Sequence, residues 1–132
     1  MTTRIRHKGV AIVDTSKGIL VVAGRSKKFT LPGGGTNRGE SRKGATIREL
    51  REETGLKTKS VKYLFSYKGR KWKSHKGRLV KNHTKVFLIK TYGAAKPNHE
   101  IKYIDYWKPK SKIRISHRTE DLIKKYLELK NK

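Results

Sequence analysis

The sequence predicts an α/β fold in which helices cover the faces of a mixed β-sheet. Three observations point to this class: short β-branched runs recur along the 132 residues, one helical pattern lies between them, and an amphipathic pattern closes the chain. Because neither an internal repeat nor a linker separates these elements, we expect residues 1–132 to form one domain.

The first half of the chain contains two strand patterns, a loop and a helix. The β-branched runs Lys8–Asp14 and Gly18–Gly24 are separated by three polar residues, which predicts an antiparallel hairpin. Phe29–Glu40 is rich in glycine and is expected to form a loop. Ser41–Thr54 carries a helical pattern whose serine is a suitable N-cap and which Gly55 is placed to terminate.

The second half continues with strand patterns and ends on a helix. Ser60–Gly69 reads as a strand, and Arg70–Asn82 as a polar, basic connection. His83–Gly93 has enough apolar residues for a central strand, and Glu100–Trp107 is a shorter strand pattern. The apolar spacing of Thr119–Lys130 predicts an amphipathic helix with its threonine as the N-cap.

The charge balance indicates a polyanionic partner. The chain has 35 Lys and Arg against 10 Asp and Glu, a net charge of +25. Such a field attracts nucleic acid, nucleotides, inositol polyphosphates or an acidic membrane surface, although a generally basic, solvated surface would have the same composition. No apolar run approaches the roughly 20 residues that span a bilayer. Among these candidates we expect no membrane partner. Cysteine is absent, which excludes disulfides and thiolate sites; we expect a cytoplasmic protein.

Three of the few acidic residues fall on one turn of the predicted helix. Glu49, Glu52 and Glu53 stand at i, i+3 and i+4 and therefore share a face. Like charges at these spacings destabilise a helix by a few tenths of a kcal/mol per pair. Arg48 and Arg51 could offset this repulsion as ordinary surface ion pairs. Three carboxylates aimed at one point would instead form a hard oxygen site for Mg²⁺ or Mn²⁺.

The segment before the helix favours the metal site. Pro32–Gly35 can bring backbone against a ligand without side-chain obstruction, and Glu40 follows at the entrance to the helix. The spacing resembles the Nudix box, G-x5-E-x7-R-E-U-x-E-E-x-G-U, in which U is a bulky aliphatic residue. All its fixed positions match: Gly34, Glu40, Arg48, Glu49, Leu50, Glu52, Glu53, Gly55 and Leu56.

The resemblance to the Nudix hydrolase family implies an α/β/α sandwich around a mixed sheet. It implies hydrolysis of a nucleoside diphosphate linked to another moiety X, with Mg²⁺ or Mn²⁺. By similarity, the metal ligands would be Glu49, Glu52 and Glu53, joined by a backbone carbonyl for which Gly33 is the best candidate. Arg48 would hold the glutamates by ion pairing. The remaining box residues would serve the loop: Glu40 as a brace, and Gly34 and Gly55 in backbone turns.

The general base is open at this stage. Glu100 is our candidate, because it begins a late strand pattern and few other acids remain. It could equally be a surface residue at a strand edge. Glu49 or Glu53 could accept the proton instead, and Asp105 is a weaker alternative.

The substrate is also open. Cations near the glycine loop and around an aromatic in Lys68–His83 suit phosphate binding and base stacking, or form an exposed basic loop. The candidate substrate-binding residues are Arg25, Lys28, Arg38, Arg70, Trp72 and Lys73. Besides nucleoside diphosphate derivatives, RNA 5′ ends and diphosphoinositol polyphosphates are alternatives, and a non-catalytic nucleic-acid-binding module is an alternative of another class. Either a monomer or a homodimer would fit.

Overall fold

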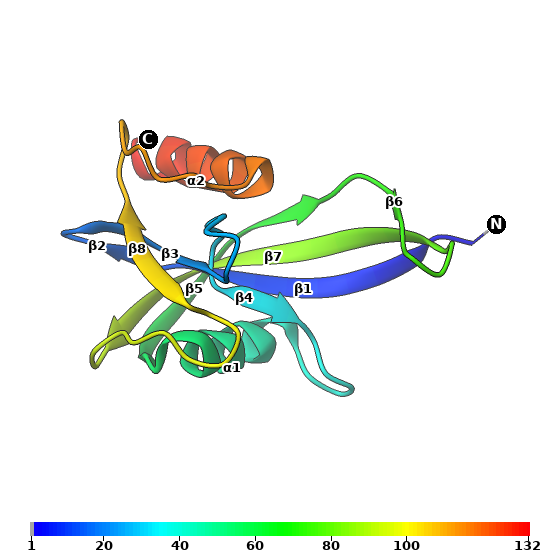
Figure 1. Ribbon diagram of the computed structural model, residues 1–132, viewed down its shortest axis with the longest axis horizontal. Coiled ribbons are helices and arrows are strands. Elements are labelled where there is room, and N and C mark those ends of the chain that lie inside the picture. The colour runs from blue at the N-terminus through cyan, green and yellow to red at the C-terminus, as the bar shows by residue number, and fades with distance from the viewer. Residues whose placement is uncertain (1) are drawn as a thin grey trace.

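The computed structural model describes residues 2–132 and confirms the predicted α/β fold around a mixed sheet (Figure 1). Its elements are β1 (Arg4–Ile12), β2 (Asp14–Thr15), β3 (Gly18–Ala23), β4 (Gly33–Gly35), α1 (Arg42–Thr54), β5 (Lys57–Lys68), β6 (Trp72–Lys73), β7 (Leu79–Tyr92), β8 (Tyr103–Trp107) and α2 (His117–Lys130). The larger sheet has the order β4-β1-β7-β5, with β6 paired to β7. Strands β1 and β7 are parallel and its other pairs antiparallel. A smaller antiparallel sheet has the order β2-β3-β8.

Helices bury both faces of the sheet along the second half of β1. Successive strand side chains point to opposite faces. Val10 and Ile12 accordingly pack in the core cluster that includes residues of α2. Ala11 and Val13 pack in a second cluster with Leu50 of α1. The two helices therefore lie on opposite sides of the sheet (Figure 1), which explains a continuous rather than alternating apolar run.

The first strand is longer than predicted and has different partners. It begins at Arg4 rather than Lys8 and pairs in parallel with β7 along its whole length. The predicted hairpin is reduced to β2 and β3, where Asp14 lies opposite Ile19. Local sequence pattern could not reveal this pairing, because the parallel partner is supplied by a distant segment.

Part of the predicted glycine-rich loop Phe29–Glu40 is the strand β4, which runs antiparallel to β1 with Gly33 opposite Val10. Gly33 has φ +148°, a conformation that L-residues rarely adopt. A Cβ atom there would overlap the carbonyl oxygen of Gly9. Glycine is required at this position because the two backbones approach too closely for a side chain.

Replacing Gly33 by alanine is expected to lower the free energy of unfolding by about 2–4 kcal/mol, because strain and overlap act together. Chemical denaturation of the purified proteins measures this change. Gly24→Ala is the matched control, since its added Cβ would come no closer than 3.4 Å to the Glu100 carbonyl oxygen. A Gly33→Ala protein as stable as the control would show that β4 does not require this close approach.

The basic segment after β5 is folded rather than a plain connection. Strand β5 begins at Lys57, earlier than predicted, and the predicted connection Arg70–Asn82 contains β6 and the start of β7. Trp72 lies opposite Val80 across this short hairpin. We call residues 4–8 and 69–83 the arm, because these stretches of β1, β6 and β7 project beyond the body, at the right of Figure 1.

Both helices begin after a capping serine. Ser41 Oγ accepts the Gly44 N–H at 2.9 Å, and α1 ends at Gly55 in the left-handed conformation, as predicted. Helix α2 is capped by Ser116, whose Oγ accepts the N–H of Thr119. The prediction of Thr119 as the N-cap was wrong, because its side chain is buried one turn inside the helix. Neither helix of residues 2–132 has the length and apolar composition that crossing a membrane requires.

Candidate active site

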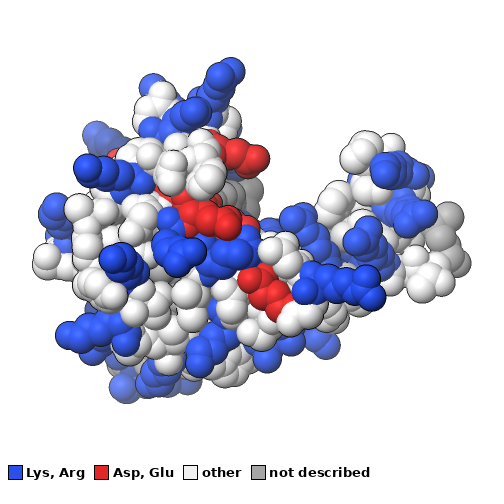
Figure 2. Space-filling model, turned by 90° about the horizontal axis from the view of Figure 1, so that it is seen from below, with Lys and Arg blue, Asp and Glu red and all other residues white. Residues whose placement is uncertain are grey.

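One face of α1 carries the acidic cluster. Glu49, Glu52 and Glu53 line a single hollow of about 410 Å³, which we call the acidic hollow. Its remaining lining comes from the loop before β8, namely residues 99–101. Figure 2 shows acidic side chains on the underside of the molecule, bordered closely by Lys and Arg.

Arg48 joins this cluster to the loop that precedes α1. Its guanidinium makes two hydrogen bonds to Glu40, from Nε to Oε2 at 2.8 Å and from Nη2 to Oε1 at 2.9 Å. Its Nη1 donates to Glu49 Oε1 at 2.8 Å and to Glu52 Oε2 at 3.3 Å. Nη2 also donates to the Gly35 carbonyl oxygen at 3.2 Å. One planar side chain therefore fixes the helix, its acidic face and β4 relative to one another.

The Arg48–Glu40 pair is charged over a wide pH range. Hydrogen bonds from Arg48, and then from the Asn37 N–H, lower the pKa of Glu40 to about 2 and outweigh a small desolvation effect. The bonds to Glu40 raise the pKa of Arg48 in turn. The Arg48–Glu40 ion pair, which we call the brace, therefore keeps both charges under all physiological conditions.

Glu53 lies deepest in the acidic hollow. Its Oε1 accepts the Gly33 N–H at 2.9 Å. Burial raises the pKa of Glu53 to about 7, although the Gly33 hydrogen bond opposes the shift; the neighbouring charges of Glu49, Glu52 and Glu100 raise it further. Without a cation, this carboxyl is therefore held in a site that disfavours its negative charge.

Glycines bring the sheet into contact with α1. A Cβ atom on Gly34 would lie 3.0 Å from Glu49 Cδ, so the bare backbone of β4 allows Glu49 to pack against it. Gly9 on β1 has the same role further along, since a Cβ there would overlap Thr46 Oγ1 and the Arg42 carbonyl oxygen. Sequence reasoning missed Gly9, which stands alone in a strand pattern, where an isolated glycine signals close backbone approach.

A backbone connection brings Glu100 to the acidic hollow. The Lys96 N–H donates to the Thr54 carbonyl at 2.9 Å, and the Asn98 N–H donates to the Glu53 carbonyl at 3.1 Å. Glu100 follows in an exposed turn, and not at the start of a strand as predicted, because β8 begins only at Tyr103. The last turn of α1 thus holds the loop that presents this fourth carboxylate.

The donor set of the acidic hollow suits a hard divalent cation, although its side chains are not yet gathered around one point. Within residues 2–132, no three His, Asp or Glu side chains are close enough together to hold a metal ion. Arg48 draws Glu49 and Glu52 to one side, and the Gly33 N–H draws Glu53 to another. Each carboxylate keeps one oxygen without a hydrogen bond among the described residues. Rotation of these side chains toward a shared cation would relieve their mutual repulsion, which adds to the effect of burial on the pKa of Glu53.

A second hollow, of about 420 Å³, lies beside Gly33 and the start of α2, and we call it the α2 hollow. Apolar side chains such as Leu31 line it together with Lys8 and Arg118. Burial is the main cause that lowers the pKa of Lys8, and nearby arginines lower it further. Cations beside an apolar wall are a lining that suits a phosphorylated ligand with an apolar part.

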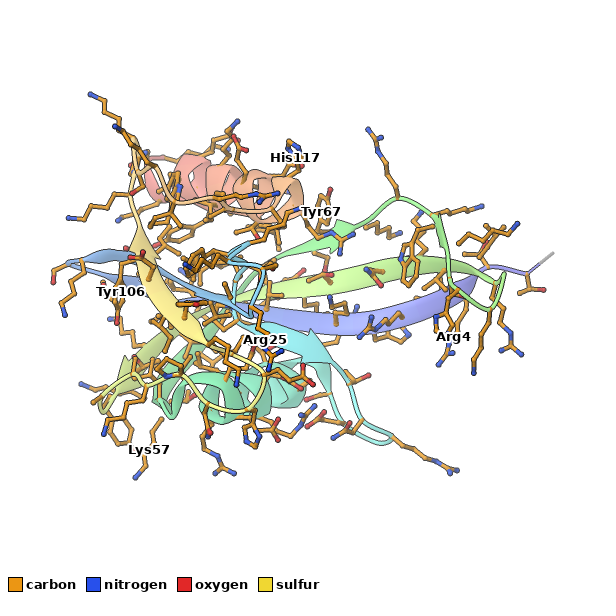
Figure 3. The ribbon with its side chains drawn as sticks, viewed as in Figure 1. Arg4, Arg25, Lys57, Tyr67, Tyr106 and His117 are labelled. Atoms are coloured by element: carbon orange, nitrogen blue, oxygen red, sulfur yellow. The ribbon has the colours of Figure 1, made fainter. Side chains whose placement is uncertain are left out.

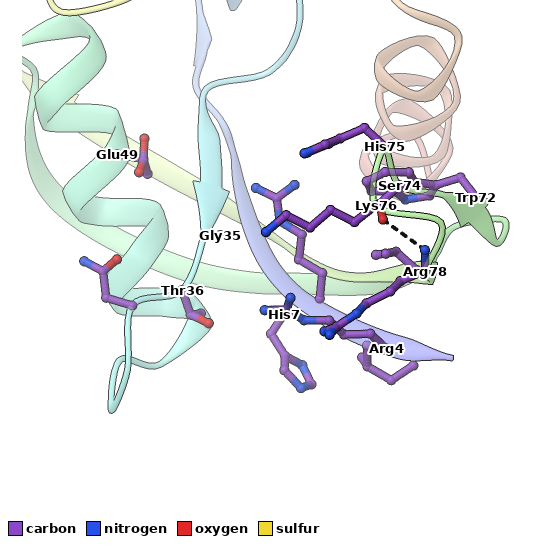
Figure 4. Close-up of a pocket in the computed structure, with 14 residues that line it drawn as sticks. Arg4, His7, Gly35, Thr36, Glu49, Trp72, Ser74, His75, Lys76 and Arg78 are labelled. Atoms are coloured by element: carbon purple, nitrogen blue, oxygen red, sulfur yellow. Dashed lines mark hydrogen bonds between the residues drawn. The ribbon is translucent and has the colours of Figure 1, made fainter. Parts of the chain in front are cut away.

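A third hollow, of about 780 Å³, lies between the arm and β4, and we call it the arm pocket (Figure 4). Within the arm, Arg4 and His7 of β1 and Trp72 of β6 line it. Gly35 and Glu49 stand at its inner end, and Glu49 also lines the acidic hollow. The space-filling view shows the molecule deeply indented between body and arm (Figure 2). The arm pocket and the acidic hollow therefore share Glu49 as a lining residue.

The predicted substrate-binding residues do not form one site. Trp72 lines the arm pocket and Lys28 the α2 hollow, whereas Arg25, Arg38, Arg70 and Lys73 line none of the three hollows. Figure 3 shows Arg25 over the body, well away from Arg4 at the end of the arm.

Sequence reasoning missed several cations that line the hollows, namely Arg4, Arg6, Lys8 and Arg118. The first three alternate along β1, which is a signal for one strand face. They were overlooked because the predicted strand began only at Lys8.

Comparison with known proteins shows the family to which this fold and this sequence motif belong. A family model described as the NUDIX domain matches residues 4–125. A Nudix hydrolase family member from Chromobacterium violaceum is 32% identical, with a TM-score of 0.82 over 100% of this chain and 83% of its own. No curated protein gives a significant match.

Two further structures share the fold at lower identity. The NUDIX domain of Shewanella oneidensis NrtR, solved in complex with ADP ribose, is 16% identical with a TM-score of 0.70, covering 97% of this chain and 88% of that one. An ADP-ribose pyrophosphatase from Streptococcus suis is 20% identical with a TM-score of 0.68, covering 96% and 92%. Because the family model spans nearly the whole chain and the Chromobacterium relative aligns with all of it, this chain belongs to the Nudix hydrolase family and is a pyrophosphohydrolase.

Proposed function

We propose that this protein is a Mg²⁺- or Mn²⁺-dependent hydrolase that cleaves the diphosphate linkage of a nucleoside diphosphate joined to a moiety X. Nudix hydrolases generally use divalent metals such as Mg²⁺. The observation that carries the proposal is the convergence of Glu49, Glu52, Glu53 and Glu100 on one hollow. In a chain of net charge +25, a hollow lined by four carboxylates is explained by a cationic ligand.

In this proposal Glu49, Glu52 and Glu53 hold the cation, and the Gly33 carbonyl remains a candidate for a further ligand. When bound, the cation would neutralise diphosphate charge and lower the pKa of a water molecule. Arg48 keeps the acidic face of α1 aligned with β4, and its removal would free the carboxylates to rotate.

The reaction adds water across the P–O–P anhydride. The water oxygen forms a bond to one phosphorus as the bridging P–O bond breaks, which yields two phosphate-terminated products. In this proposal Glu100 accepts the water proton. Two observations support it: Glu100 lines the acidic hollow, and its carboxylate makes no hydrogen bond among the described residues. Glu49 or Glu53, which also line the acidic hollow, is the alternative base.

The α2 hollow and the arm pocket, near the acidic hollow, are two places into which the ends of a bound substrate could extend. The α2 hollow has an apolar wall with Lys8 and Arg118 at hand, a lining suited to a base near phosphates. ADP ribose, the ligand of the NrtR NUDIX domain, is a nucleoside diphosphate derivative of this kind. It therefore supports nucleoside diphosphate derivatives as the first substrates to examine.

A hydrolysis assay tests the proposal. The purified protein is incubated with ADP-ribose, dNTPs, diadenosine polyphosphates, 5′-triphosphate RNA and a diphosphoinositol polyphosphate, with Mg²⁺, Mn²⁺ or a chelator. Cleavage of a diphosphate bond that requires the cation supports the proposal. If no diphosphate is cleaved with either cation, or cleavage persists fully in the chelator, the proposal is wrong.

The raised pKa of Glu53 predicts a specific pH dependence of stability in metal-free protein. The carboxyl has a pKa of about 7 in the folded state against 4.5 as its ordinary value, so the folded state holds more protons between these limits. The free energy of unfolding should therefore fall as pH rises from about 4.5 to about 7, by roughly 2–3 kcal/mol.

Denaturation with a chelator present, at several pH values, measures this slope in the wild-type protein and in Glu53→Gln. The difference between the two proteins isolates Glu53 from histidines that titrate in the same range. Mg²⁺ should offset the loss at pH 7 in the wild-type protein only. Equal slopes in both proteins would contradict the assignment of the raised pKa to this carboxyl.

A further inference from the structure

The arm pocket concentrates positive charge that the protein itself does not neutralise. Its cationic lining residues are Arg4, Arg6, Lys76 and Arg78. None of these four forms a salt bridge within residues 2–132. The one carboxylate in the lining, Glu49, already accepts a hydrogen bond from Arg48. Four unpaired cations around one hollow repel one another, and an anion bound among them would relieve that repulsion.

The arm is built in a way that holds these cations around the pocket. A tight turn closes the β6–β7 hairpin, in which the Ser74 N–H donates to the Arg78 carbonyl at 2.8 Å and the Gly77 N–H donates to the Ser74 carbonyl at 2.9 Å. Figure 4 shows Lys76 and Arg78 on this hairpin, across the pocket from β4. The Arg6 guanidinium lies near Gly35 at the inner end of the pocket: a Cβ atom added to Gly35 would be 3.5 Å from Arg6 Nε.

The pocket also has the size and the partial apolar lining of a ligand site. Its volume of about 780 Å³ falls within the usual range for small-molecule sites. Trp72 is 40% exposed and Ile5 is 37% exposed, and both line the pocket. A half-exposed tryptophan on a small hairpin gives one flat wall against which a ring can stack.

We propose that the arm pocket is a subsite for a compact group bearing two or more phosphates, so that the moiety X that carries the cleaved diphosphate is itself polyphosphorylated. This inference rests on the proposed function, because it places X next to the acidic hollow. Glu49 lines both hollows, so a diphosphate held at α1 can extend directly into the arm pocket. The hydrolysis is unchanged: water is added, the bridging P–O bond breaks, and X leaves with its own phosphates intact.

Charge removal inside the pocket tests the proposal. The double variant Arg4→Ala/Arg78→Ala removes two of the four cations that line the pocket, one on β1 and one on the β6–β7 hairpin; both side chains are exposed, so the fold should persist. We expect kcat/KM for a diphosphoinositol polyphosphate to fall about 100-fold, mostly through KM, since each lost charge-assisted contact is worth about 10-fold. The fall for ADP-ribose should be much smaller, so the ratio of the two kcat/KM values should change by at least about 10-fold.

The matched control removes two exposed cations that line none of the three hollows, in the variant Lys62→Ala/Lys71→Ala. It should change both kcat/KM values by less than about threefold at the same ionic strength. If the control lowers activity as much as the pocket variant, only the general field of the protein acts. If both substrates lose equally, the pocket does not select a polyphosphorylated X. Either result overturns the proposal.

A binding measurement separates this inference from the proposed function. Inositol hexakisphosphate has no diphosphate bond, so its binding by titration calorimetry is independent of hydrolysis. Binding that Arg4→Ala/Arg78→Ala weakens about 100-fold supports the subsite, even if no substrate is cleaved. Undiminished binding overturns the subsite, even if hydrolysis is observed. A preference for 5′-triphosphate RNA that grows with chain length would also overturn it, because an extended strand and not a compact group would then be recognised.

Discussion

Glu52→Gln is expected to lower kcat by about 10³-fold or more and to leave the protein folded. The substitution preserves shape but removes the negative charge that would help to hold the cation. Stability should change little, because Glu52 is 41% exposed and its one hydrogen bond, from Arg48, is long at 3.3 Å. Steady-state hydrolysis with Mg²⁺, together with circular dichroism of each protein, measures both effects.

Glu128→Gln provides the matched control for that substitution. Glu128 is an exposed glutamate near the end of α2, far from the acidic hollow in sequence and lining none of the three hollows. Its removal makes the same change in net charge and should leave kcat within about twofold of the wild-type value. Retention of full activity in Glu52→Gln would mean that the acidic face of α1 is not the catalytic site.

Arg48→Ala is expected to damage both activity and stability. It removes five hydrogen bonds at once and leaves Glu49 and Glu52 facing one another without a cation between them. We expect a fall in kcat/KM of about 10²-fold and a loss of about 1–3 kcal/mol in the free energy of unfolding. The link between α1 and Gly35 on β4 would be lost in the same variant.

Two comparisons show whether the guanidinium geometry matters or only its charge. Arg48→Lys keeps the charge but cannot make the bidentate contact to Glu40, so it should recover only part of the activity. Arg51→Ala removes an exposed arginine from the same helix and should be close to wild type in both measurements. If Arg51→Ala were as damaging as Arg48→Ala, general helix electrostatics would explain the result, and not the brace.

The acidic face of α1 could be predicted because it is a local property of the chain. Helical spacing alone puts Glu49, Glu52 and Glu53 on one side, and the caps at Ser41 and Gly55 delimit the helix without any tertiary contact. The α/β class followed in the same way from the apolar runs and the two helix patterns. These features depend only on neighbours within a few residues.

Features that depend on distant segments could not be predicted in this way. The parallel pairing of β1 with β7 set the true start of β1 at Arg4. Glu100 lines the acidic hollow because backbone hydrogen bonds hold its loop against the end of α1. The sequence placed Glu100 at the start of a strand, but that strand begins only at Tyr103. The arm pocket depends on the pairing of β6 with β7. This pairing lets Trp72 and Arg4, which are distant in sequence, line the same pocket.

Titration of the metal-free protein with Mn²⁺, followed by electron paramagnetic resonance, tests the central claim most directly. The claim is that the carboxylates of the acidic hollow hold a divalent cation. We predict that the wild-type protein and Glu128→Gln bind Mn²⁺ equally, and that Glu52→Gln and Glu53→Gln each weaken this binding by at least about 10-fold. Mn²⁺ binding of wild-type strength in both Glu52→Gln and Glu53→Gln would contradict the claim and place any metal of this protein elsewhere.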